Sequence, residues 1–195
     1  MRVIAGVAKG VPLRAPGGSS TRTRPTTDRV REAVFSVLVD WAGTVGDAVE
    51  NQLAGLQVLD LYAGSGAIAI EAVSRGASRA VAVDSSSVAV AAIRTNAAAT
   101  KLEVEAVRAS AVDFLKNSSH TAFDIVWLDP PYDLPGEAVN GVLSMIVTGW
   151  LAPGGIVAVE RSGRDESPDW PVGLESTASR RYGETVVHFA QEATS

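Results

Sequence analysis

From Gln57 onward, short apolar runs alternate with segments of helical spacing, and this alternation is the feature that most constrains the fold. The predicted strands are Val58 to Leu61, Ala80 to Val83, Val104 to Val107, Phe123 to Leu128 and Ile156 to Val159. The predicted helices between them are Gly66 to Arg75, Ser87 to Ala98, Val112 to Lys116 and Ala138 to Ile146. Strands joined through helices pair in parallel by right-handed crossovers. The pattern therefore predicts an α/β fold with a mostly parallel sheet and helices on both faces.

The C-terminal end departs from this alternation. Two strand-like runs, Ser179 to Tyr182 and Val186 to Phe189, are separated only by Gly183-Glu184-Thr185. Three residues are too few for a crossover helix, so the two runs are predicted to form an antiparallel hairpin. A parallel sheet that ends in a reversed strand resembles the Rossmann-like class I methyltransferases, which use S-adenosylmethionine (SAM).

Composition indicates an ordinary globular chain. Its 195 residues are 46% hydrophobic, which suits one domain with a full core. The absence of cysteine excludes disulfides, thiolate metal sites and cysteine nucleophiles, and fits a reducing compartment. The two histidines, His120 and His188, have no ligand-like spacing, so no metal is expected. Charged residues interrupt the N-terminal apolar residues and no apolar run could span a bilayer, so we expect a cytoplasmic monomer without membrane partners.

Positive charge is concentrated at the N-terminal end. Residues 1 to 31 contain seven basic side chains against one acid, Asp28, whereas the rest of the chain is acidic. Such a segment is a candidate contact for a polyanion, and a solvated arm without a partner is the alternative. No aromatic residue precedes Phe35, so the segment would grip phosphates rather than stack bases. The predicted RNA contacts are Arg2, Lys9, Arg14, Arg22, Arg24, Arg29 and Arg31.

The same end of the chain is predicted to form a small structural unit. Arg2 to Val7 and Val11 to Arg14 are strand-like runs that would pair as a hairpin. We therefore expect a basic hairpin or arm over residues 1–24 and the main domain over residues 25–195. Thr26-Thr27-Asp28 predicts the start of the first helix, because hydroxyl and carboxylate side chains cap helix N-termini.

The first predicted strand runs into the glycine turn Ala63-Gly64-Ser65-Gly66. Glycine lets a backbone pass close beneath a ligand, and the helix that follows offers free N–H groups. Gly64-x-Gly66-x-x-Ala69, with Asp84 as the ribose-binding acid, also loosely satisfies the dinucleotide fingerprint, so an NAD-dependent oxidoreductase is an alternative. Asp60 favours SAM, because a carboxylate there suits a cationic amino-acid group better than a pyrophosphate. The chain also lacks a Tyr-x-x-x-Lys catalytic set.

The motif Asp129-Pro130-Pro131-Tyr132 directly follows the apolar run Phe123 to Leu128. It should therefore lie at the carboxyl end of a strand, the edge where open parallel sheets bind ligands. The two prolines stiffen the backbone and remove two N–H donors. Asp129 and the Pro130 carbonyl could accept the two N–H bonds of a planar amine while Tyr132 stacks on its ring. A simple strand-ending turn is the alternative reading.

These motifs together resemble one known family. Val58-Leu59-Asp60-Leu61-Tyr62-Ala63-Gly64-Ser65-Gly66, Asp84 and Asp129-Pro130-Pro131-Tyr132 are similar to methyltransferases of exocyclic amines. Arg2-Val3-Ile4-Ala5-Gly6, Lys9-Gly10-x-x-Leu13 and Arg24-Pro25-Thr26-Thr27-Asp28-Arg29-Val30-Arg31-Glu32 resemble the bacterial ribosomal RNA guanine-N2 methyltransferases of the RsmD type. The resemblance implies methylation of one guanine of 16S rRNA in an assembling small subunit, with residues 25–195 as the methyltransferase domain.

The resemblance also implies roles for individual residues. Gly64 to Gly66 would pass beneath the cofactor, Asp60 would face its methionine end, and Asp84 would accept from its ribose hydroxyls. Ser110-Ala111 stands where the family usually carries Asp-Ala at the adenine. The hydroxyl of Ser110 is a weaker acceptor than a carboxylate. Val11 stands where a second basic residue commonly follows Lys-Gly, which predicts a weaker RNA contact at that turn.

Three further functions remain open from the sequence. A DNA adenine-N6 methyltransferase shares the Asp-Pro-Pro-Tyr motif, but the chain leaves little room for a target-recognition region. A protein-glutamine methyltransferase would resemble Asn-Pro-Pro-Tyr instead. A non-enzymatic RNA-binding assembly factor could retain a cofactor pocket, although intact Asp129 and the glycine turn argue against decay.

Overall fold

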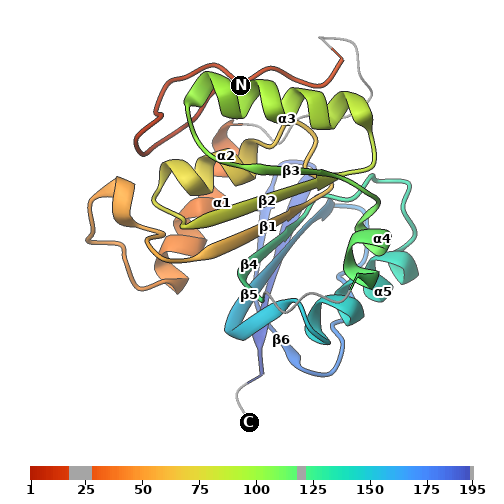
Figure 1. Ribbon diagram of the computed structural model, residues 1–195. Coiled ribbons are helices and arrows are strands. Elements are labelled where there is room, and N and C mark those ends of the chain that lie inside the picture. The colour runs from red at the N-terminus through yellow and green to blue at the C-terminus, as the bar shows by residue number, and fades with distance from the viewer. Residues whose placement is uncertain (18–27, 118–121, 194–195) are drawn as a thin grey trace.

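The computed structural model describes residues 1–17, 28–117 and 122–193 and contains a seven-stranded sheet (Figure 1). The strands are β1 (Gln57–Leu61), β2 (Arg79–Asp84), β3 (Glu105–Arg108), β4 (Phe123–Leu128), β5 (Leu151–Ser162), β6 (Leu174–Tyr182) and β7 (Thr185–Glu192). The helices are α1 (Asp28–Trp41), α2 (Ala67–Ser74), α3 (Ser87–Thr100), α4 (Ala111–Lys116) and α5 (Gly136–Val147), with a 3₁₀ turn over Val49–Asn51. Every strand and helix predicted from Gln57 onward is present.

The strand order is β3-β2-β1-β4-β5-β7-β6. The first five strands in this order are parallel, because each is reached from its predecessor through a helix on one face of the sheet. β7 runs antiparallel to both of its neighbours, β5 and β6. The predicted fold class, a mostly parallel sheet that ends in an antiparallel hairpin, is confirmed.

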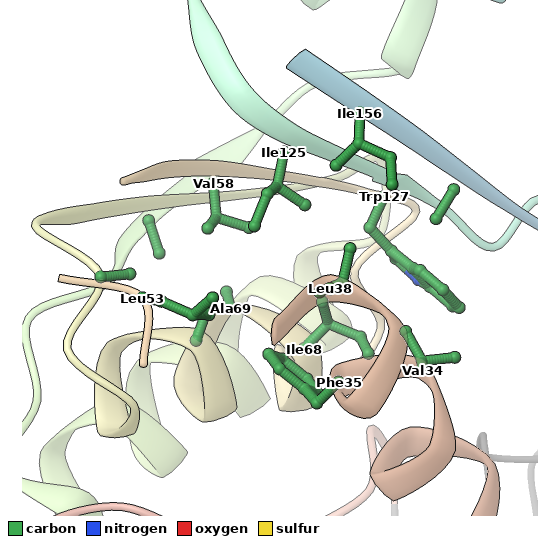
Figure 2. Close-up of a cluster of buried hydrophobic side chains, with 14 of the residues drawn as sticks. Val34, Phe35, Leu38, Leu53, Val58, Ile68, Ala69, Ile125, Trp127 and Ile156 are labelled. Atoms are coloured by element: carbon green, nitrogen blue, oxygen red, sulfur yellow. The ribbon is translucent and has the colours of Figure 1, made fainter. Parts of the chain in front are cut away.

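The helices form two layers, one on each face of the sheet. α1, α2 and α3 pack on one face, and α4 and α5 pack on the other. In Figure 2, side chains of α1 and α2 point toward Val58, Ile125, Trp127 and Ile156 of the sheet. Phe35 on α1 and Trp127 on β4 are fully buried there. Burying a large apolar side chain contributes about 1.5 to 3 kcal/mol, so the burial of this helix face anchors α1 to the sheet.

Two strands begin well before the residues that the sequence pattern indicated. β5 begins at Leu151 rather than Ile156, and its pairing with β4 shifts register between Phe123 and Ile125. Pro153 and two glycines lie in the added stretch, and such residues within a strand usually mark an irregularity or an end. β6 begins at Leu174 rather than Ser179, because its mostly exposed residues form the edge of the sheet and show no apolar run. No helix in the described ranges is long and apolar enough to cross a membrane.

The N-terminal segment, residues 1–17, packs against α2 instead of extending as a free arm. A single antiparallel bridge joins Arg2 to Pro12, so the predicted hairpin forms its turn but no regular strands. The chain reversal is held by bonds from Val3 N–H to the Val11 carbonyl and from Gly10 N–H to the Val3 carbonyl. Its buried side chains Val3, Ala8 and Leu13 pack with Ala67 and Ile70. The expected boundary between residues 24 and 25 lies outside the described residues.

Two polar residues of α2 hold this segment in place. Both carboxylate oxygens of buried Glu71 accept backbone N–H groups, from Ile4 at 2.7 Å and from Ala5 at 3.0 Å. The Ser74 hydroxyl accepts from Ala8 N–H and donates to the Ala5 carbonyl. Gly6 passes so close that a Cβ would lie 1.7 Å from the Ser74 carbonyl oxygen, and its φ is +78°. Only glycine fits at that position.

Replacing Glu71 with Gln should destabilise the protein by about 3 to 5 kcal/mol, because buried Arg75, whose Nε lies 3.0 Å from Glu71 Oε1, loses the negative charge that compensates its own. Urea unfolding would measure the change in the free energy of unfolding. Glu105→Gln is the matched control, since its pair with Arg79 is exposed and should contribute at most about 1 kcal/mol. Equal losses for the two variants would contradict the structural role of Glu71.

Candidate active site at the carboxyl edge of the sheet

The carboxyl ends of four strands meet at one edge. Leu61 of β1 pairs with Val83 of β2 and with Leu128 of β4, and Asp84 pairs with Arg108 of β3. Because these strands are parallel, the loops that leave them are neighbours. The structure thus brings together Asp60, the turn Ala63-Gly64-Ser65-Gly66, Asp84, Ser110, Ala111 and the motif Asp129-Pro130-Pro131-Tyr132.

The glycine turn after β1 has an unusual backbone. Tyr62, Gly64 and Gly66 all have positive φ, at 61°, 54° and 73°. A Cβ on Gly64 would meet no atom within 4 Å, so the space over the turn is open to a ligand. A Cβ on Gly66 would come within 3.1 Å of Ile93, so this glycine permits α3 to pack closely against the turn.

Asp84 at the end of β2 braces the turn. Its Oδ2 accepts from Gly64 N–H at 2.9 Å, and its Oδ1 accepts from Ser86 N–H at 2.8 Å. Each carboxylate oxygen can accept more than one hydrogen bond, so Asp84 can also receive bonds from hydroxyl groups. The predicted contact with ribose hydroxyls is compatible with this geometry and stays a prediction.

Asp60 is a buried acid beneath the turn, with 1% of its surface exposed. Its Oδ2 accepts from Ala69 N–H of α2 at 3.2 Å. Burial raises the pKa of Asp60 to about 8; the bond from Ala69 opposes this shift, and the charge of Asp84 adds to it. A cation beside the carboxyl would favour its ionised form. Asp60 therefore suits a ligand that brings an ammonium group to this edge.

Ser110 follows β3 and caps α4. Its hydroxyl accepts from Asp113 N–H at 3.0 Å and donates to Asp113 Oδ2 at 2.7 Å. Because a hydroxyl has one hydrogen, Ser110 can approach an adenine amine only as an acceptor while it keeps this bond. Ala111 is buried in the first turn of α4. The adenine contacts of both residues stay predictions.

The Asp129 motif continues the edge of β4. Asp129 N–H donates to the Leu61 carbonyl at 3.4 Å, so its backbone extends the ladder with β1. Pro130 is buried, and Leu134 N–H donates to the Pro131 carbonyl at 2.9 Å to close a turn. Tyr132 is 49% exposed. A half-buried carboxylate and an accessible aromatic ring thus flank the open glycine turn.

The predicted RNA contacts divide into three groups. Arg2, Lys9, Arg14 and Arg29 are exposed. Arg22 and Arg24 lie outside the described residues. Arg31 is wrong as an RNA contact, because its side chain is fully buried, donates to the Arg2 carbonyl and pairs with Asp28 at 3.0 Å. The charge count could not show that position 31 lies on the buried face of α1.

Two buried polar residues near the site carried no sequence signal. Glu71 anchors the N-terminal segment, as described above. Asn96 on α3 donates to the Ser65 carbonyl of the glycine turn at 2.9 Å. Neither lies in a recognisable motif, and only the packing of α2 and α3 brings them to the turn. Within the described ranges, no three potential ligand side chains are grouped so as to hold a metal ion.

Strand order and site together define the class of the protein. The dinucleotide-binding alternative has a parallel sixth strand, whereas here β7 is inserted antiparallel between β5 and β6. SAM and a methyl acceptor are expected at the carboxyl edge of such a sheet. This edge carries the glycine turn, Asp84 at the end of β2 and the Asp129 motif after β4. The fold is that of the class I SAM-dependent methyltransferases.

Comparisons with known proteins agree with this class. The family model described as "Conserved hypothetical protein 95" matches residues 1–191. A putative rRNA methyltransferase, YlbH of Bacillus subtilis, is 33% identical over 192 residues, 96% of each chain. Ribosomal RNA small subunit methyltransferase D of Escherichia coli is 34% identical, covering 88% of this chain and 79% of the relative. A putative methyltransferase structure, yhhF from Escherichia coli, superposes with a TM-score of 0.76 at 29% identity, covering 100% and 99%.

This chain therefore belongs to the Conserved hypothetical protein 95 family of methyltransferases, which includes the RsmD type. The resemblance found in the sequence is confirmed.

The pKa of Asp60 predicts a pH dependence of stability. The folded protein holds a proton up to about pH 8 that the unfolded chain releases near pH 3.8. The free energy of unfolding should therefore fall as pH rises between these values, by up to about 1.4 kcal/mol per pH unit. Asp60→Asn, which keeps an acceptor for Ala69, should lack this contribution.

Urea unfolding of the wild type and Asp60→Asn at pH 5, 6, 7 and 8 would test this prediction. Asp47→Asn is the control, because Asp47 is exposed. Parallel pH profiles for the wild type and Asp60→Asn would show that Asp60 is ionised throughout this range.

Proposed function

We propose that this protein transfers a methyl group from SAM to the exocyclic N2 of one guanine in 16S rRNA, within an assembling small ribosomal subunit. The observation that carries the proposal is the placement of Asp129-Pro130-Pro131-Tyr132 beside the glycine turn, at the carboxyl ends of β4 and β1. The names of the relatives from Bacillus subtilis and Escherichia coli support ribosomal RNA as the substrate.

The residues of the edge fit the cofactor. Gly64 leaves open space over the turn, where the sulfonium end could lie close to the backbone. Asp60 would face the ammonium group, Asp84 would accept from the ribose hydroxyls, and Ser110 would accept from the adenine amine. When bound, SAM supplies an electrophilic methyl group on a positively charged sulfur. Each residue contributes a hydrogen bond or a charge of the sign that the corresponding part of SAM requires.

Asp129 would activate the guanine amine by position and charge. The lone pair of N2 is delocalised into the ring, so the nitrogen is a weak nucleophile. Asp129 and the Pro130 carbonyl would accept its two N–H bonds and aim the lone pair at the methyl carbon. Transfer of the methyl group from sulfur to nitrogen would develop positive charge on N2, and the Asp129 carboxylate would stabilise that charge. One N–H proton then leaves N2 through Asp129.

Tyr132 would hold the target base. Its ring is half exposed and follows the two prolines, which limit the motion of the backbone that carries it. A guanine can reach this edge only after it leaves its stack, and an aromatic face replaces part of the lost stacking.

The exposed basic residues of the N-terminal segment would hold the RNA. Arg2, Lys9 and Arg14 are exposed on a segment whose apolar side chains pack on α2, so the backbone that carries them is fixed. A polyanion bound there releases counterions, which makes affinity depend on salt. With a ribosomal substrate, the protein would act in the cytoplasm. It would act as a monomer.

An adenine-N6 methyltransferase of DNA is the second candidate, because the Asp129 motif would present an adenine amine equally well. Radiolabelled methyl transfer from SAM to small subunits, free 16S rRNA and duplex DNA, followed by nucleoside analysis, separates the two. N2-methylguanosine from the small subunit or the rRNA would support the proposal. N6-methyladenine from DNA would show that the substrate is DNA and not rRNA. No transfer to any of the three would favour a non-enzymatic assembly factor.

Asp129→Ala should lower the rate of methyl transfer at least about 100-fold, because it removes the group that stabilises charge on N2. Its affinity for S-adenosylhomocysteine (SAH), measured by calorimetry, should stay within about threefold of the wild type. Asp133→Ala is the control, since this exposed acid lies one residue beyond the motif. Near-normal transfer by Asp129→Ala would exclude the assigned role.

Replacing Arg2, Lys9 and Arg14 together with Ala should weaken binding of 16S rRNA and flatten its salt dependence, by about 0.7 to 0.9 in log–log slope per lost phosphate contact. SAH affinity should be unchanged. A control triple variant at exposed Lys116, Arg164 and Arg180 removes the same charge elsewhere. If both triple variants lose affinity equally, the effect is one of net charge and not of the N-terminal segment.

A further inference from the structure

Asn96 connects the glycine turn to the N-terminal segment. It lies on α3 with 1% of its surface exposed. Its Oδ1 accepts from Arg14 N–H at 2.8 Å, and its Nδ2 donates to the Arg14 carbonyl at 2.9 Å. The same Nδ2 donates its second hydrogen to the Ser65 carbonyl at 2.9 Å. One side chain thus binds two segments that are 51 residues apart in the sequence.

The side-chain amide of Asn96 can transmit movement because it is planar and nearly all of its hydrogen-bonding capacity is used. Both hydrogens of Nδ2 and one lone pair of Oδ1 are used by these two segments. A buried amide that turned away from either segment would leave a buried polar group without a hydrogen bond, which is unfavourable. The Ser65 carbonyl and the Arg14 backbone are therefore constrained to move together.

Ser65 is the cofactor side of this connection. It lies between Gly64 and Gly66, in the turn over which SAM is proposed to bind. Glycine on both sides makes this backbone easy to shift. A second contact reaches the segment here, because the Ser65 hydroxyl lies 3.8 Å from the Met1 sulfur.

Arg14 is the RNA side of the connection. Its side chain is exposed, and it is one of the proposed phosphate contacts. The preceding residue, Leu13, is buried and donates its N–H to the Met1 carbonyl, so Met1 and Leu13 lie side by side. A change in the Asn96 bonds would reposition the backbone that carries the Arg14 guanidinium.

We propose that Asn96 is a positioning residue that couples SAM binding to RNA binding, by fixing the Ser65 carbonyl and the Arg14 backbone relative to each other. The inference rests on the proposed function. RNA should bind more tightly to the cofactor-loaded protein, and by linkage the cofactor should bind more tightly to the RNA-loaded protein by the same factor. If Asn96 only stabilised the fold, its replacement would change the stability of the protein without changing this factor.

The test measures the affinity of small ribosomal subunits by filter binding, with and without saturating SAH. For the wild type, SAH should tighten RNA binding at least about fivefold. Asn96→Ala and the nearly isosteric Asn96→Leu should reduce this ratio to about one, while each variant still binds SAH and RNA separately. Thr95→Ala is the control, because Thr95 is exposed and its hydroxyl donates to the Ala91 carbonyl of its own helix; it should keep the wild-type ratio.

A wild-type ratio of one would overturn the inference, and so would a full ratio in folded Asn96 variants. If neither variant folds, hydrogen exchange of the Arg14 amide in the wild type replaces them: SAH should slow that exchange, and an unchanged rate would refute the coupling. Methyl transfer by the wild type is measured in parallel. Failure of transfer to any RNA rejects the proposed function, whereas transfer without coupling rejects only the role of Asn96.

Discussion

The parallel pairing of β1 with β2 on one side and β4 on the other is the constraint on which the site depends. It places Leu61, Val83 and Leu128 in register, so the glycine turn, Asp84 and the Asp129 motif leave the sheet as neighbours. The pairing is held by buried strands between two helical layers. The loops are free to adopt the positive φ angles and the proline-rich turn that ligand binding requires.

The N-terminal segment depends on the same frame through different forces. Its apolar contacts with α2 are few, and its backbone is held mainly by Glu71, Ser74 and Asn96. These bonds go to main-chain groups, so they fix the path of the segment without restricting most of its side chains. The exposed basic side chains can therefore change their conformation while the backbone that carries them stays packed against α2.

The elements that the sequence predicted well have local causes. The apolar runs of the strands, the short turn before β7 and the glycines of the turn after β1 all follow from short-range patterns. The errors occurred where distant residues matter. Arg31 was counted as surface charge but is buried against the Arg2 carbonyl. β5 already begins at Leu151, before Pro153, because Leu151 pairs with Phe123 of β4.

Taken alone, the sequence determined the fold class, the methyltransferase motifs and the family, because each depends on residue type and spacing over a few positions. The tertiary structure was needed for everything that depends on which surfaces meet. Burial raised the pKa of Asp60, took Arg31 away from solvent and brought Asn96 between Ser65 and Arg14. No periodicity encodes these contacts, since a hydrogen bond between residues 14, 65 and 96 exists only after α2 and α3 have packed on the sheet.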